Sequence, residues 1–117
     1  MGSWGYSPLE NDDAQSLLDD FKKSKNIVIL EKALDAVCYL SNDEYLEAPA
    51  AEQAIAAAHI IKDLSNPQIN LETRARLNEK AERALRRVLE QSELKDLWAE
   101  SPLYDEWTKA VRALLSE

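Results

Sequence analysis

Residues 26–40 read NIVILEKALDAVCYL, and the spacing of their apolar side chains decides the fold class. The opening letters NIVIL alone could pass for a strand. Apolar residues continue at helical spacing beyond them, however, through Leu30, Leu34 and Val37. A period near 3.6 indicates a helix, and Asn26 is a suitable N-cap for it. Because apolar residues cover most of its circumference, we predict that this helix is a central one, covered on several sides.

Helical periodicity recurs in the other long segments, and no segment shows the period of two that is typical of strands. Asn11 is a suitable N-cap for a helix that begins at residue 12. Residues 50–64, AAEQAIAAAHIIKDL, are so rich in alanine that another helix can approach them closely. Besides the central helix, we expect helices at 12–23, 50–64 and 71 to about 91, a short one after Ser92 and a last one opened by Ser101 and Pro102. The sequence therefore predicts an all-α fold, a compact bundle of five or six helices in a single domain spanning residues 1–117.

The bulk composition is that of a globular, acidic protein. The chain has 117 residues, a net charge of −8 and one cysteine, which excludes an intrachain disulfide. Its negative field disfavours direct contact with nucleic acid or anionic membrane and favours basic partners. The first residues lack a signal-peptide pattern, and the apolar runs are too short to span a membrane. We therefore expect a cytoplasmic protein.

The two glycines of the chain flank a tryptophan in the opening stretch MGSWG. A chain terminus normally frays, but an indole can bury on the order of 200 Å² and hold such a segment in place. Glycine allows a tight backbone turn, through a positive φ or a close contact. We predict an ordered N-terminal segment in which Gly2, Trp4 and Gly5 close the bundle. A surface offered to a ligand or partner is the alternative.

Several short motifs occur in a recognisable order along the chain. They are M-G-S-W-G at residues 1–5, N-D at 11–12, Y-L-E-A-P at 45–49, S-E-L with L-W at 92–98, and E-W at 106–107. In this order they resemble a family of small bacterial proteins catalogued as a domain of unknown function, series number four-two-five-nine. The resemblance covers essentially the whole chain. It implies a small cytosolic bacterial protein, and genes of the family are expected beside toxin genes, which suggests immunity roles. At His59 this family often has an acidic residue, so a role tied to that acid is not carried over.

Residues suited to catalysis or metal binding are sparse. His59 has no partner pattern and is interpreted as a half-buried packing residue, and Cys38 as a small buried apolar one. Acidic residues gather at 10–13 and 43–47, but neither group has the alternating acids and central glycine of an EF-hand. We therefore predict no enzyme, no cofactor and no metal.

A basic stripe of Arg76, Lys80, Arg83 and Arg87 recurs at helical spacing within residues 71–91. In isolation such a stripe suggests contact with nucleic acid. Three glutamates stand four residues before an arginine, however, in the pairs Glu72–Arg76, Glu79–Arg83 and Glu82–Arg86. Such pairs stabilise a helix, so an ordinary salt-bridged surface is the favoured interpretation.

These observations favour a binding protein. The first hypothesis is an immunity or inhibitor protein that neutralises a basic bacterial toxin domain, such as a nuclease, by occluding its active site with an acidic face. The predicted contact residues are the acids near two loop-to-helix junctions: Glu10, Asp12, Asp13, Asp43, Glu44 and Glu47. The alternative is a regulatory or structural interaction module of unknown partner, with homodimerisation through the alanine-rich helix.

Overall fold

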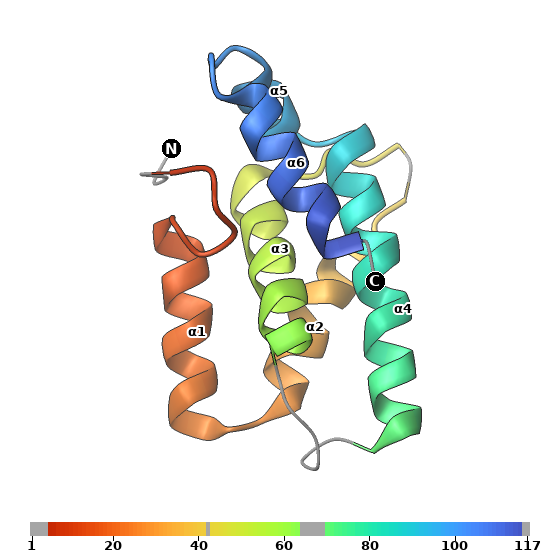
Figure 1. Ribbon diagram of the computed structural model, residues 1–117. Coiled ribbons are helices and arrows are strands. Elements are labelled where there is room, and N and C mark those ends of the chain that lie inside the picture. The colour runs from red at the N-terminus through yellow and green to blue at the C-terminus, as the bar shows by residue number, and fades with distance from the viewer. Residues whose placement is uncertain (1–4, 42, 64–69, 116–117) are drawn as a thin grey trace.

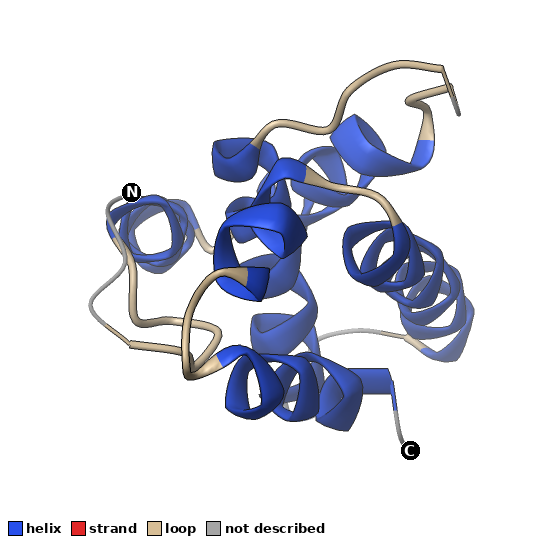
Figure 2. Cartoon of the chain, turned by 90° about the horizontal axis from the view of Figure 1, so that it is seen from above, coloured by secondary structure: helices blue, strands red, loops and turns tan. Residues whose placement is uncertain are grey.

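Six helices make up the fold of the part of the chain that the structure describes. The computed structural model describes residues 5–41, 43–63 and 70–115. The helices are α1 (Asp12–Ser24), α2 (Ile27–Cys38), α3 (Ala48–Asp63), α4 (Leu71–Glu90), α5 (Glu93–Ala99) and α6 (Tyr104–Leu115). Figure 2 shows these helices joined by loops, with no strand in the described part of the chain. The predicted all-α bundle of about six helices is confirmed.

The most central helix is α3, and α2, which the sequence predicted to be covered on several sides, contacts α1, α3 and α4. The α3 helix contacts each of the other five helices (Figure 1). Its buried residues lie all round its axis, from Ala51 to Ile61. By contrast, the buried residues of α2 form one stripe, and Val28 is 48% exposed. Alanine explains the difference, because its small side chain lets five neighbours approach one axis closely.

The alanines of α3 are not available as a dimer surface. Ala51, Ala54, Ala56 and Ala57 are each 0% exposed, and Ala58 is 2% exposed. Other helices of the same chain already cover them, because α3 contacts all five neighbours. Homodimerisation through this face, as proposed from the sequence, would therefore require the bundle to open.

The helix boundaries follow from local side-chain chemistry. An N-cap side chain accepts a hydrogen bond from a backbone N–H in the first turn, which has no partner within the helix. Asn11 does so from Ala14 at 2.7 Å, Asn26 from Val28 at 3.0 Å and Ser92 from Lys95 at 3.0 Å, as the sequence predicted. Asn70 caps α4 in the same way, with its Oδ1 2.7 Å from the Thr73 nitrogen.

Aromatic stacking joins the last two helices. The Trp98 ring of α5 lies 6.2 Å from the Trp107 ring of α6, and the ring planes are 11° apart. Tyr104 stacks on the same Trp107 ring, also at 6.2 Å between centroids. Both tryptophans are buried, at 5% and 2% exposure. Offset stacking and burial of this area fix the short helix α5 against α6.

The N-terminal anchor is described only in part, because Gly2 and Trp4 lie outside the described residues. Gly5 is described, and its φ is not positive. A Cβ atom at this position would overlap the carboxylate of Glu10. Of the two reasons considered for glycine, left-handed backbone does not apply at Gly5, and the close contact there is with the end of a flexible side chain.

Candidate functional site

The structure separates the six predicted contact acids into two groups. Glu10, Asp12 and Asp13 lie at the start of α1, which contacts only α2 and α3 among the described helices. Asp43, Glu44 and Glu47 lie in the connection between α2 and α3, which is bonded to α4 and α5. In Figure 1, α1 stands on one side of α3, and the connection passes the upper end of α4 on the other side. The six acids do not form one patch.

The α1 group has local structural roles. The Glu10 carboxylate accepts a hydrogen bond from the Ser7 backbone N–H at 3.2 Å, which closes a turn. Asp12 and Asp13 stand in the first helical turn, where the helix dipole stabilises negative charge. Asn11, which precedes them, is 3% exposed and caps the helix. These local contacts explain why acids stand at the start of α1, without the need for a partner protein.

The other group belongs to a connection that is firmly held, and we call residues 39–47 the α2–α3 loop. Its first half is bound by the guanidinium of Arg87 on α4. Arg87 Nη1 donates to the carbonyl oxygens of Leu40 at 3.4 Å and Ser41 at 3.1 Å, and Nη2 donates to that of Glu44 at 2.6 Å. A positive group there also suits the carbonyl end of α2. One side chain therefore satisfies three loop carbonyls.

The second half of the loop is fixed by Glu93 at the start of α5. The Glu93 backbone N–H donates to the Leu46 carbonyl at 2.8 Å, and the Glu93 carboxylate accepts from the Ala48 N–H at 2.8 Å. The second bond satisfies a backbone donor in the first turn of α3. The Leu46 side chain is 1% exposed and packs in the core. The loop is therefore anchored by polar bonds and by burial.

Two exposed tyrosines stand among the exposed acids of the held loop. Tyr39 is 75% and Tyr45 is 62% exposed. The Lys80 ammonium lies 5.9 Å from the centre of the Tyr39 ring, a cation–π contact that positions the ring. Desolvation and the charges of Glu93, Asp96 and Glu47 raise the pKa of the Tyr45 phenol. Two carboxylates of α5 thus join the acidic surroundings of the loop.

Four residues of this surface were not predicted from the sequence as contact residues: Tyr39, Tyr45, Glu93 and Asp96. The available signal was the pair of tyrosines on either side of Asp43 and Glu44, since exposed tyrosines are common in binding interfaces. The contribution of α5 depends on tertiary packing, because Glu93 meets Ala48 across 45 residues of chain.

Replacing Arg87 with methionine tests how the loop is held. Methionine keeps the apolar stem but removes the donors, so the loop carbonyls lose their charged partner. We expect a loss of about 1.5–3 kcal/mol in the free energy of unfolding, as is typical for hydrogen bonds to charged groups. Arg83→Met on the same helix is the control, because Arg83 is exposed. Equal stabilities of the two variants in urea denaturation would contradict the anchoring role of Arg87.

The basic stripe of α4 is used within the fold. Arg76 Nε lies 3.0 Å from Glu31 on α2, and Lys80 Nζ lies 2.6 Å from Glu31 and 2.8 Å from Asp35. Hydrogen bonds from Arg76 and Lys80 lower the pKa of Glu31, and those to Asp35 and Glu31 raise the pKa of Lys80. Arg76 therefore pairs across helices and not with Glu72.

Of the pairs expected within α4, Glu82–Arg86 is present at 3.5 Å. With Arg76 and Lys80 committed to α2, and Arg87 committed to the loop, the stripe functions mainly in packing α4. This is the salt-bridged surface favoured from the sequence, with partly different partners.

The remaining candidates for chemistry have structural surroundings. The His59 side chain is 30% exposed, and its Nε2 lies 3.3 Å from Asp63. Cys38 is partly buried, and burial raises the pKa of its thiol, which disfavours a nucleophilic thiolate. Within residues 5–41, 43–63 and 70–115, no group of three or more histidine, cysteine, aspartate or glutamate side chains is placed to hold a metal ion. No helix of this part of the chain has the length and apolar character needed to cross a membrane.

The fold and the loop define an all-α bundle with an anchored, acidic, tyrosine-bearing connection on its surface. Residues 2–110 match the family described as Domain of unknown function (DUF4259). The chain belongs to this family, in agreement with the resemblance found in its sequence motifs. Searches of curated proteins and of solved structures gave no significant match.

Proposed function

We propose that this chain is a small acidic binding protein that docks on a basic surface of a partner protein through the α2–α3 loop. One observation carries this proposal: the loop backbone is fixed by Arg87 and Glu93 while Tyr39 and Tyr45 remain exposed. A loop that is already ordered loses little conformational entropy on binding, which favours affinity. Tyrosines contribute large contact area, and acids select a basic partner.

The partner class is a basic toxin domain, so that the chain acts as a bacterial immunity or inhibitor protein in the cytoplasm. An active site that acts on nucleic acid is basic, because it must bind phosphates. A net charge of −8 attracts such a site, and the loop acids Asp43, Glu44 and Glu47 complement it locally. The loop then covers the active site and excludes the substrate, without catalysis or a cofactor in this chain.

Co-purification followed by an activity assay tests this function. We expect the tagged chain, expressed in its native cells, to retain a basic protein in a stoichiometric complex. Adding the purified chain should abolish that partner's activity, and the inhibition should weaken as salt rises because exposed charges are screened. A partner that retains full activity in the complex would exclude inhibition and leave an interaction module. Recovery of the chain without a stoichiometric partner would contradict both.

A further inference from the structure

The short helix α5 has an acidic outer face. Leu94 and Trp98 on the inner side of this helix belong to the core, at 0% and 5% exposure. Lys95, the one basic residue of α5, lies on a different side of the helix. The outer residues lie within about 100° of the helix circumference: Glu93, Asp96, Leu97 and Glu100. The α5 face, defined by these four residues, therefore presents one leucine among carboxylates.

The α5 face adjoins the α2–α3 loop at Tyr45. The Glu93 backbone N–H donates to the carbonyl of Leu46, the residue after Tyr45, at 2.8 Å. Desolvation, followed by the charges of Glu93 and Asp96, raises the pKa of the Tyr45 phenol, so these carboxylates lie near the ring. Tyr45 is 62% and Leu97 is 38% exposed. The loop and the helix together therefore expose an aromatic and an aliphatic side chain among acids.

The exposed acids beside Tyr45 and Leu97 are not paired with cations of this chain. Within residues 5–41, 43–63 and 70–115, no ion pair includes Glu47, Asp96 or Glu100. By contrast, Glu31 of α2 lies 2.6 Å from the Lys80 ammonium. A cationic partner can therefore pair with the acids around α5 without breaking an ion pair of the fold, which favours a basic occupant.

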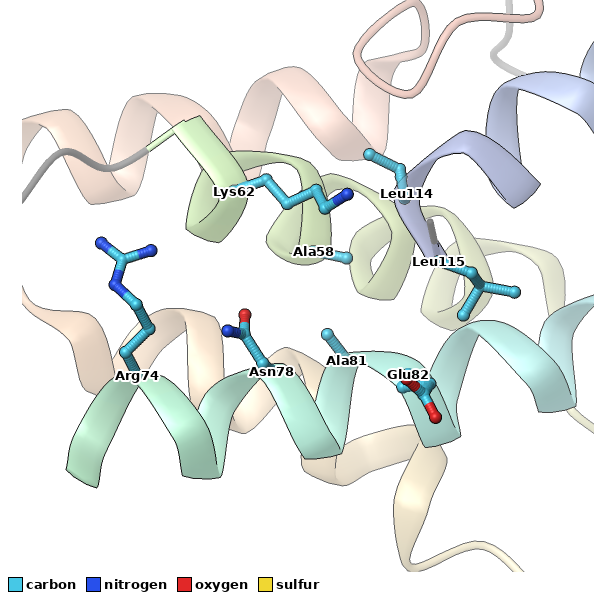
Figure 3. A pocket seen from close by; sticks show the side chains of 8 residues that line it. All are labelled: Ala58, Lys62, Arg74, Asn78, Ala81, Glu82, Leu114 and Leu115. Carbon is cyan, nitrogen blue, oxygen red and sulfur yellow. The ribbon is translucent and has the colours of Figure 1, made fainter. Parts of the chain in front are cut away.

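The charged side chains around the hollow between α3, α4 and the end of α6 are, in contrast, engaged within the fold (Figure 3). Lys62 is turned toward α6, where it donates to the Ala113 carbonyl at 3.4 Å. Arg74 also interacts within the chain, and Glu82 pairs with Arg86 at 3.5 Å. Of these two surfaces, the α5 face is the one whose charges are open to a partner.

We propose that the docking surface continues from Tyr45 onto the α5 face and receives a basic amphipathic helix of the partner protein. An apolar side chain of that helix packs against Tyr45 and Leu97, and flanking cationic side chains pair with the acids around them. A helix fits because its side chains recur at the same spacing as those of α5, so one apolar and two cationic residues meet this face in register. This inference rests on the proposed function, since it names the part of the partner that meets the loop.

Titration of the ¹⁵N-labelled protein with a synthetic helical peptide, followed by NMR, tests the α5 face. The peptide carries one leucine, with arginines about four residues before and after it on the same side. We expect saturable shifts centred on Tyr45, Asp96, Leu97 and Glu100. Replacing the leucine of the peptide with serine, or its arginines with glutamine, should weaken binding about tenfold, because each change removes one kind of contact. Shifts centred on the start of α1, no saturable binding, or equal binding of either altered peptide would overturn the proposal.

Charge variants separate the α5 face from the net charge of the protein. Asp96→Asn combined with Glu100→Gln should weaken binding of the arginine peptide about tenfold, because two pairings are lost. Asp19→Asn combined with Asp20→Asn removes the same charge from exposed positions of α1 and should change the affinity less than about twofold. Equal weakening by the two double variants would overturn the proposal.

Leu97→Ser tests the apolar contact, and Val28→Ser is its control. Val28 lies at the start of α2 and is 48% exposed. Leu97→Ser should weaken binding of the arginine peptide about tenfold, whereas Val28→Ser should leave it unchanged. Thermal melting identifies any variant that fails to fold, and the charge variants then decide. Unchanged binding by a folded Leu97→Ser variant would overturn the proposal.

The peptide experiments are independent of the natural partner, so the two proposals fail separately. If the peptide does not bind at the α5 face while a co-purified partner still depends on the loop acids, the α5 proposal is wrong and the proposed function stands. If the peptide binds as expected but no basic partner is co-purified, the proposed function is wrong and the site for a basic helix remains.

Discussion

Leu46→Ala is expected to lower the free energy of unfolding by about 2–5 kcal/mol, although Leu46 lies in a loop. Its side chain is 1% exposed and belongs to the core. Truncation removes buried apolar surface and leaves a cavity, and both effects destabilise the folded state. The loss is expected to be near the upper end if the flanking bonds to Arg87 and Glu93 prevent the loop from collapsing into the cavity.

Tyr45→Ala is the matched control for this experiment. Tyr45 is the preceding residue but is 62% exposed, so its removal should change stability by no more than about 0.5 kcal/mol. Denaturation in urea, with comparable slopes for the two variants, measures the difference. If Leu46→Ala were as mild as Tyr45→Ala, the loop would not be anchored in the core.

The helices could be predicted from the sequence because their signals are local. Asn11, Asn26 and Ser92 each cap a helix through a partner two or three residues away, and these caps were predicted correctly. Pro49 lies in the first turn of α3, where the missing N–H costs nothing. In each of these caps, the donor and the acceptor of the hydrogen bond lie within three residues of each other in the sequence.

Which helix lies at the centre of the bundle could not be predicted from local signals in the same way. Residues 26–40 were predicted to form a central helix covered on several sides, and α2 does contact α1, α3 and α4. The alanine-rich α3 contacts all five other helices, because axis-to-axis approach depends on small side chains. Hydrophobicity therefore indicated that α2 is covered but did not rank α3 above it, whereas side-chain volume would have favoured α3.

Three of the six predicted contact acids lie in the α2–α3 loop. The residues that anchor this loop, Arg87 and Glu93, were not predicted to do so. Arg87 was assigned to a surface stripe, yet it binds carbonyls 43 to 47 residues earlier in the chain. Glu10, Asp12 and Asp13 were selected together with the loop acids because both groups lie near loop-to-helix junctions, but α1 lies on the other side of α3. Contacts of such separation depend on topology, which periodicity does not specify.

Reversing the charges of Asp43, Glu44 and Glu47 to lysine is expected to slow association with the basic partner by about 10- to 100-fold. Each substitution replaces an attraction with a repulsion at the docking surface, and such changes act mainly on the association rate. All three side chains are exposed, and the substitution at Glu44 also removes a hydrogen bond that its carboxylate accepts from the Ser41 backbone N–H at 3.0 Å. Reversal of Glu10, Asp12 and Asp13 is the control, since it changes the net charge by the same amount.

The control group requires a stability measurement beside the kinetics. Asp12 and Asp13 lie in the first turn of α1, and lysine there opposes the helix dipole at a cost of about 0.3–1 kcal/mol each. Circular dichroism and thermal melting must therefore show that both triple variants are folded at the assay temperature. Comparing the association rates of the two variants then separates the effect of where the charges are reversed from the effect of how many are reversed.

Stopped-flow association of the wild type and the two triple variants with the same partner, at several salt concentrations, tests the docking surface most directly. We predict a large loss of rate for the loop variant and a much smaller loss for the α1 variant. The difference should shrink as salt rises, because screening acts within about 8–10 Å at physiological ionic strength. Equal losses would show that only net charge matters, and a larger loss for the α1 variant would place the docking surface at the start of α1. Either result would contradict docking through the α2–α3 loop.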